Sequence, residues 1–309
     1  MGFTECIEQK GSILMEGALG ERLKREYSLP FDDNIVMGSL VYSRCGRNAL
    51  EALWSEYAEI AYTHGLPFLA TTTTRRTNQE RVARSGYDKS IIQRNVDFLR
   101  QVQTKQRAEM YVGGLIGCKG DAYTGEGALN FKSSRFFHAW EIELFAQAMV
   151  DFIYAALIPS LGEAAGIAAA IAEYKVPYII SFTIQKNGRL IDGQPISQAI
   201  EYIDRLIDFK PICYMTNCVH PRIVYEALLQ PINNTPAVKE RFMGIQANTS
   251  ALSYEELDHA IDLKTSDPVS LAEDMLNLRT LQPFKIFGGC CGTDGSHMDE
   301  IAKRLEKQK

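Results

Sequence analysis

Residues 176–207, VPYIISFTIQKNGRLIDGQPISQAIEYIDRLI, contain the clearest signal of the fold, because a strand pattern is followed by a helix pattern. The first part of this stretch, Val176–Phe182, is a short apolar run rich in β-branched and aromatic residues, which is typical of a buried strand. Isoleucines then recur in steps of four, three and four residues, at Ile196, Ile200, Ile203 and Ile207. This spacing puts them on one face of a helix, so the stretch predicts one strand-and-helix unit.

The same alternation extends through the chain. Eight short apolar runs are separated by longer stretches with helical period, such as the one that carries Ile92, Val96 and Leu99. The eight predicted strands are Ile13–Glu16, Phe68–Thr71, Met110–Leu115, Phe152–Ile158, Val176–Phe182, Ile212–Met215, Phe242–Gln246 and Phe284–Phe287. Such alternation is typical of an α/β protein with a parallel sheet covered by helices, either open or closed into a barrel.

The residues after the first strand favour the closed form. A nucleotide-binding open sheet would carry a glycine fingerprint there, and residues 16–20, EGALG, do not match one. No linker, charge block or low-complexity tract interrupts the pattern. We therefore predict a single (β/α)8 TIM barrel over residues 1–309, with long loops at 32–46, 117–135 and 233–238.

Composition limits the partners of the chain. The 309 residues are 46% hydrophobic, and 33 basic against 38 acidic residues give a net charge of -5. This charge gives no support to nucleic-acid or membrane-surface binding, which leaves small solutes as expected partners. The start of the chain is polar, and no run approaches the roughly 20 apolar residues of a membrane helix. We expect a cytoplasmic protein.

Polar residues and cysteines gather where predicted strands end. Glu16, Asn217 with Cys218, Asn248, and the pair Cys290 and Cys291 are examples. In a barrel of this kind, the loops after the strands meet at one end and carry the chemistry. Three cysteines from two strand ends could therefore converge on one ion and leave a fourth position open, which is the pattern of a catalytic zinc site.

Other interpretations of the cysteines stay open at this point. An adjacent pair can also be two small core residues or a strained disulfide, although the flanking glycines Gly288, Gly289 and Gly292 would let both sulfurs turn toward one ion. The odd total of seven cysteines argues against a disulfide framework. Four have no such context and are interpreted as inert, namely Cys6, Cys45, Cys118 and Cys213. His220 could be a fourth ligand, but beside Pro221 it more simply begins a helix.

A thiolate-rich zinc site has a definite chemistry. Three thiolates leave the site with one negative charge, so an added thiol can bind, lose its proton at neutral pH and keep an electron-rich sulfur. Alkyl transfer to sulfur follows from this. A zinc hydrolase or lyase is the rival enzyme class, but it would more often use His and carboxylate ligands and a nearby general base.

Two motifs resemble those of the homocysteine S-methyltransferase family. Residues 288–293, GGCCGT, match its Gly-Gly-Cys-Cys-Gly-Thr motif, and residues 217–221, NCVHP, match its Asn-Cys-x-x-Pro motif. Residues 158–160 and 181–183 extend the resemblance. It implies a TIM barrel in which Cys218, Cys290 and Cys291 hold Zn²⁺, and methyl transfer to a zinc-bound thiolate. The implied acceptor is homocysteine, giving methionine in methionine biosynthesis, and the donor is a small molecule or a separate methyl-carrying corrinoid protein.

The chain departs from this family where the amino group of homocysteine would bind. Residues 16–18 are EGA where the family has Asp-Gly-Gly, and Ala156 stands where the family has a Glu. The lost charge-assisted hydrogen bond would cost about 1.5 to 3 kcal/mol of binding. Either the longer Glu16 compensates, or the acceptor is a different thiol. A non-catalytic zinc- or thiol-binding protein is the third alternative.

Further residues are candidates for substrate contacts. Glu16, Asn217 and Asn248 are the predicted substrate-binding residues, although Asn248 could equally form a turn. The run Thr71–Thr74 with Arg75 could line the mouth of the barrel or serve only the strand. Four aromatic side chains could form a cage for a cationic donor, or the last three could be helix core: Tyr123, Phe136, Phe137 and Trp140.

Overall fold

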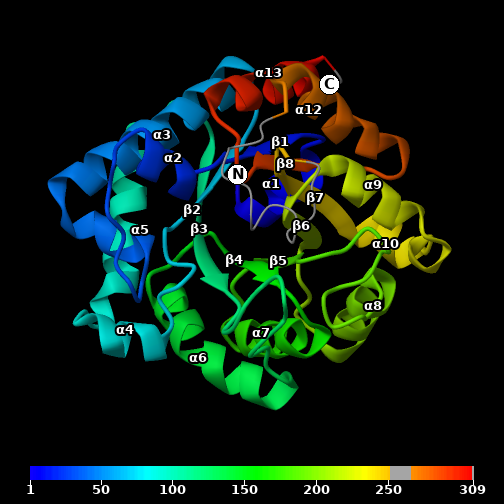
Figure 1. Cartoon of the computed structure of the whole chain (residues 1–309), viewed down its shortest axis with the longest axis horizontal. Coiled ribbons are helices and arrows are strands. Elements are labelled where there is room, and N and C mark those ends of the chain that lie inside the picture. Colours follow the sequence, from blue (N-terminus) through cyan, green and yellow to red (C-terminus); the bar gives the residue numbers. More distant parts are fainter. Residues whose placement is uncertain (251–265, 308–309) are drawn as a thin grey trace.

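The eight expected strands close into a parallel barrel in the order β1 to β8 (Figure 1). The structure is a computed structural model that describes residues 1–250 and 266–307. The strands are β1 Ile13–Met15, β2 Phe68–Thr71, β3 Met110–Gly117, β4 Phe152–Ile158, β5 Tyr178–Phe182, β6 Cys213–Val219, β7 Phe242–Ala247 and β8 Ile286–Gly289. Pairing of β1 with β8, at Ile13 with Ile286 and Leu14 with Phe287, closes the ring. The prediction of a (β/α)8 barrel is confirmed.

Most of the helices form a ring outside the strands (Figure 1). The helices are α1 Phe3–Gln9, α2 Gly20–Arg25, η1 Met37–Tyr42, α3 Arg44–Thr63, α4 Gln79–Ser85, α5 Ser90–Gln103, α6 Phe131–Gln147, α7 Leu161–Tyr174, α8 Ile196–Leu206, α9 Pro221–Leu229, η2 Pro231–Asn233, α10 Pro236–Arg241, α12 Pro268–Asn277, η3 Leu278–Thr280 and α13 Gly295–Glu306. The predicted isoleucine face of α8 is buried at Ile196, Ile200 and Ile203. No helix in the described parts of the chain combines the length and hydropathy that crossing a bilayer requires.

Several predicted boundaries were wrong. Strand β6 continues to Val219, so Asn217 and Cys218 lie within the strand and not after it. Their side chains suggest a strand end, but the residues on either side of Cys218, Asn217 and Val219, still pair with β7. Helix α10 occupies the second half of the predicted loop 233–238, because the hydroxyl of Thr235 accepts a hydrogen bond from the N–H of Val238 and caps the helix. The loop 32–46 contains η1, and the loop after β3 ends at Asn130.

Helix α1 packs across one end of the barrel. Phe3 stacks on Phe152 of β4 with ring centroids 4.4 Å apart and meets Tyr111 of β3 edge-on. These residues belong to a cluster inside the barrel, which is separate from the larger core between strands and helices. Because α1 covers this end, the cavity described below opens at the other end, where the strands finish.

A buried cluster of charged groups joins α6 to α7. The ring of His138 on α6 contacts Glu141 at 2.6 Å and Glu163 of α7 at 3.1 Å. Burial disfavours a charged ring, but the hydrogen bonds to the two carboxylates outweigh it and raise the pKa of His138 to about 9. Glu163 also accepts hydrogen bonds from the N–H groups of Lys119 and Leu129. The cluster therefore ties both helices to the loop after β3.

We expect this cluster to make the stability of the fold depend on pH. The pKa of His138 is higher in the folded chain than its ordinary value of 6.5, so its stabilising charge is fully present below pH 6.5 and is lost as the pH rises toward 9. Urea unfolding across this range should show the free energy of unfolding falling with pH, by on the order of 3 kcal/mol for such a shift. The difference between the wild type and His138→Leu isolates this contribution. If that difference does not change with pH, the imidazole is not the group responsible.

Candidate active site

Three sulfur atoms from distant parts of the chain meet at the end of the barrel. Cys218 lies near the end of β6, whereas Cys290 and Cys291 directly follow β8. Their sulfur atoms all lie within 4.8 Å of one another, and those of Cys218 and Cys291 are 3.5 Å apart. The convergence expected from the sequence is present. No other group of this kind occurs within residues 1–250 and 266–307.

An irregular backbone brings Cys218 into the cluster. The pairing of β6 with β7 shifts register between Asn217 and Val219, which leaves Cys218 as an extra residue in its strand. Cys218 also has φ of +60°, an uncommon conformation for a residue with a side chain. Such a bulge changes the direction of a side chain, and backbone strain of this kind is concentrated at functional sites.

The turn that carries the cysteine pair depends on glycine at one position. Gly292 has φ of +84°, and a Cβ there would lie only 2.0 Å from the hydroxyl oxygen of Thr249. Its N–H donates to Glu21 of α2 at 2.6 Å, and the hydroxyl of Thr293 donates to the carbonyl of Cys290 at 2.7 Å. The two preceding glycines lie in β8 without a positive φ, so the turn begins later than the sequence suggested.

The donor set fits a zinc ion. Sulfur atoms bound tetrahedrally at about 2.3 Å lie about 3.8 Å apart, and the observed spacing matches this closely enough to need only small side-chain adjustments. Hydrogen bonds from Cys290 and Cys291 hold the pKa of the Cys218 thiol well below its usual range. The same contact with Cys218 raises the pKa of Cys291 to about 12. The cluster thus already favours one thiolate, and a divalent cation would favour all three.

A cavity of about 210 Å³ opens beside the sulfur atoms. It is lined by ends of strands around the barrel, and its walls include Glu16, Arg75, Tyr123, Ala156, Leu157 and Asn217. The volume lies below the range of about 300 to 1,000 Å³ that is usual for drug-sized ligands. The cavity therefore suits a small molecule whose reactive atom reaches the cysteines.

Glu16, one of the residues predicted to contact the substrate, lines this cavity, and both oxygens of its carboxylate accept hydrogen bonds. One oxygen accepts from the indole N–H of Trp54 at 2.8 Å, and the other accepts from the hydroxyl of Thr71 at 2.5 Å. The N–H of Thr71 donates to both oxygens. Burial raises the pKa of Glu16 to about 7, although the hydrogen bonds from Thr71 and Trp54 oppose the shift.

Asn217 also lines the cavity and braces a second irregular strand. Its Oδ1 accepts hydrogen bonds from the N–H of Leu157 at 3.1 Å and from the hydroxyl of Ser181 at 2.6 Å. Leu157 has φ of +57°, where the pairing of β4 with β5 changes register. Because Oδ1 accepts both bonds, the amide orientation is fixed, and Nδ2 makes no hydrogen bond to the described residues. That N–H₂ group is available to a ligand.

The other predicted residues fall in different places. Asn248 is not among the residues that line this cavity, and its Oδ1 faces the N–H of Ser250 in a turn. His220 caps α9 by accepting a hydrogen bond from the N–H of Arg222, which confirms the interpretation that it begins a helix. It is not part of the group of metal-ligating side chains formed by the three cysteines. The hydroxyl of Thr74 donates to the carbonyl of Leu115, which supports a structural role.

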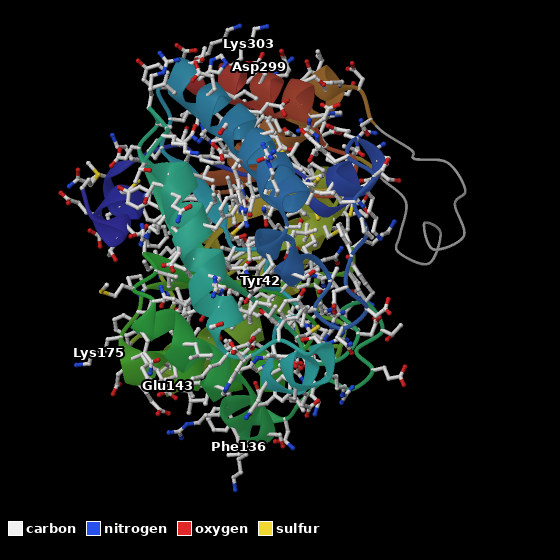
Figure 2. All side chains as sticks on the ribbon, turned by 90° about the vertical axis from the view of Figure 1, so that its left-hand side faces the viewer. Tyr42, Phe136, Glu143, Lys175, Asp299 and Lys303 are labelled. Atoms are coloured by element: carbon white, nitrogen blue, oxygen red, sulfur yellow. The ribbon has the colours of Figure 1, made fainter. Side chains whose placement is uncertain are left out.

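The proposed aromatic cage is not formed, because its four residues lie apart. Tyr123 lines the cavity, and its hydroxyl contributes to lowering the pKa of Cys218. Phe136 is 87% exposed and lies at the outer edge of α6 (Figure 2), so the core interpretation was wrong for it too. Phe137 packs under Lys119, and Trp140 packs against the core. The helical pattern alone did not reveal which face of α6 turns outward.

Two residues that support the site were missed by sequence reasoning. Glu21 holds the turn at Gly292, and Trp54 of α3 binds Glu16. Neither belongs to a motif, and each acts across a long sequence separation. Only the folded chain could identify them.

Comparison with solved structures supports the fold. The chain is similar to the homocysteine methyltransferase MmuM from Escherichia coli. The metallated form has 16% sequence identity and a TM-score of 0.74, with 97% of this chain and 98% of that chain covered. The oxidized form has 17% identity and a TM-score of 0.76, covering 96% and 97%. The apo form has 17% identity and a TM-score of 0.66, with the same coverage of 96% and 97%. At such identities, the likeness establishes a shared fold.

Comparison with sequence families supports a closer relationship. Curated protein sequences give no match to this chain. The family model described as homocysteine S-methyltransferase, in contrast, matches residues 13–305, which span the whole barrel and all three clustered cysteines. Because this match covers nearly the full length, the protein belongs to the homocysteine S-methyltransferase family and is an S-methyltransferase.

Proposed function

We propose that this protein transfers a methyl group to the sulfur of a small thiol with Zn²⁺ as cofactor, and that homocysteine is the default acceptor, giving methionine. The observation that carries the proposal is the cluster of three sulfur atoms within 4.8 Å of one another at the wall of a small cavity. The whole chain, residues 1–309, would act as one homocysteine-binding-like barrel domain within methionine biosynthesis.

In the proposed reaction, the methyl carbon loses its bond to the donor and gains a bond to the sulfur of the acceptor. The acceptor loses its thiol proton to solvent, and a lone pair of its sulfur forms the new carbon–sulfur bond. The bond from the methyl carbon to the donor heteroatom breaks, and its electron pair stays on the donor. A zinc ion held by Cys218, Cys290 and Cys291 would supply the lowered thiol pKa that this reaction needs at neutral pH.

The residues of the cavity would position the acceptor and exclude water. The free N–H₂ group of Asn217 can donate to a polar group of the acceptor. Glu16 can approach an ammonium group only by sharing oxygens that already accept from Thr71 and Trp54. Ala156 and Leu157 give an apolar wall. Orientation of the two reactants is the main contribution that such a site makes. The donor would be a small molecule or a separate methyl-carrying corrinoid protein.

We expect the purified protein to bind zinc and to admit a thiol to the metal. Zinc-edge X-ray absorption should report a shell with three protein sulfurs that gains a further sulfur when homocysteine is added. Incubation with homocysteine and a methyl sulfonium, such as S-methylmethionine, or a methyl ammonium, such as betaine, should then yield methionine. Thiol entry without turnover for any donor class would favour a non-catalytic thiol-binding protein, and failure of every thiol to reach the metal would refute the proposal.

A further inference from the structure

Arg75 is a charged residue of the cavity wall that has no partner among the described residues. It lies in the loop directly after β2, is half-buried and lines the cavity beside the sulfur cluster. Its guanidinium makes no hydrogen bond or ion pair with the residues that the structure describes. A half-buried cation loses part of its hydration, so it gains most from an anion that enters the cavity.

A glycine on the neighbouring strand β3 leaves space for the side chain of Arg75. Gly117 ends β3, and a Cβ at that position would lie 2.7 Å from Cγ of Arg75 and equally close to its carbonyl oxygen. The glycine therefore lets the stem of Arg75 pack against the strand. Packing of the stem limits the conformations that the guanidinium can adopt, which favours a specific contact over a loose charge at the surface.

Neighbouring groups do not neutralise Arg75. Arg76 follows it and donates to the carbonyl oxygens of Gly120 at 3.0 Å and Cys118 at 3.5 Å, which carry no net charge. Burial, with a contribution from the adjacent Arg75, lowers the pKa of Arg76. Arg76 is therefore a second cation close to Arg75, although it is not one of the residues that line the cavity.

The carboxylates of the cavity, in contrast, are already occupied. Glu16 is bound by Trp54 and Thr71, and Glu21 accepts from the N–H of Gly292. The wall at Ala156 adds no charge. Within the described residues, the cavity thus offers one cation without a hydrogen-bond partner, whereas both of its carboxylates already accept hydrogen bonds, and this favours an anionic ligand beside Arg75.

We propose that Arg75 binds the carboxylate of the thiol acceptor, so that this site selects small thiols by their carboxylate and does not require an α-ammonium group. The inference rests on the proposed methyl transfer to a thiol and names the class of acceptor. A guanidinium can hold a carboxylate by two parallel hydrogen bonds, which fixes the orientation of the acceptor as well as its affinity. Homocysteine belongs to this class, and so does its analogue without the amino group.

Three thiols of similar length test the proposal: homocysteine, 4-mercaptobutanoate, which lacks the ammonium, and 3-mercaptopropylamine, which lacks the carboxylate. Their binding to zinc-loaded protein is measured by calorimetric titration without any methyl donor. We expect 4-mercaptobutanoate to bind the wild type as well as homocysteine does, and 3-mercaptopropylamine to bind less tightly. Arg75→Gln should weaken binding of the two carboxylates by about 10- to 100-fold and leave 3-mercaptopropylamine unchanged.

Two further variants test whether the loss of affinity is specific to the guanidinium of Arg75. Arg75→Lys keeps the charge and should lose less affinity than Arg75→Gln, whereas Arg84→Gln, which removes an exposed arginine of α4, should change nothing. Thermal unfolding and zinc content show whether each variant keeps its fold and metal. Equal losses of affinity for all three thiols, or no loss for any of them, would overturn the role of Arg75. If no thiol reaches the metal even in the wild type, the proposed function itself fails.

Discussion

A Cys290→Ser variant is expected to bind zinc about 10²- to 10³-fold more weakly and to lose methyl transfer. Structural zinc sites bind the metal with about 10 to 16 kcal/mol, so each of four ligand positions contributes about 2.5 to 4 kcal/mol. Cys290 shares the cluster in which all sulfur atoms lie within 4.8 Å of one another. Competition with a chromophoric chelator measures the affinity, and formation of methionine from homocysteine measures the activity.

The control for this experiment is Cys45→Ser. Cys45 is exposed on α3 and lies outside the sulfur cluster, so its loss should leave zinc content and activity unchanged. If Cys290→Ser keeps zinc with the affinity of the wild type, the metal is held elsewhere. The assignment of Cys218, Cys290 and Cys291 as ligands would then be wrong.

A His138→Leu variant is expected to lower the free energy of unfolding by about 3 to 5 kcal/mol. The leucine would leave two carboxylates, those of Glu141 and Glu163, buried without the cation between them. Loss of the imidazole should also loosen the loop after β3, which Glu163 holds and which carries Tyr123 to the cavity. Urea unfolding followed by circular dichroism at pH 6 measures the effect while the histidine of the wild type is charged.

Glu143→Gln is the matched control for this variant. Glu143 is on the same helix but on the outer surface, where Figure 2 labels it, and surface substitutions usually change stability by less than about 0.5 kcal/mol. A His138→Leu variant no less stable than Glu143→Gln would mean that the buried cluster contributes no net stability.

Much of the fold could be predicted because its signals are local. The isoleucines of α8 recur at helical spacing, and all eight apolar runs became strands of the barrel. The ends of strands were predicted wrongly where the type of side chain suggests an end but the backbone continues to pair with its neighbour. Asn217 and Cys218 are polar or reactive and suggest the end of a strand, yet tertiary pairing with β7 keeps them within β6.

The candidate site could be predicted in part. Cys218, Cys290 and Cys291 were identified by their chemistry and motifs, and the structure brings them together. Arg75 was only one residue of a polar run, because a sequence does not show whether a charge finds a partner. The prediction of an aromatic cage was wrong because it also depended on tertiary contacts. Helical spacing does not show which face of α6 turns toward the mouth of the barrel.

The alternation of strands and helices, the barrel class and the three cysteines could be inferred without the structure, because periodicity and motifs depend on residues close together in the chain. Three features are visible only in the folded chain: Glu16 already accepts hydrogen bonds, Arg75 has no partner among the described residues, and Glu21 holds the cysteine turn. The contact from Gly292 to Glu21 spans 271 residues of sequence. Such contacts depend on how strands from opposite ends of the chain meet when the barrel closes, and no local pattern encodes the hydrogen-bond partners that result.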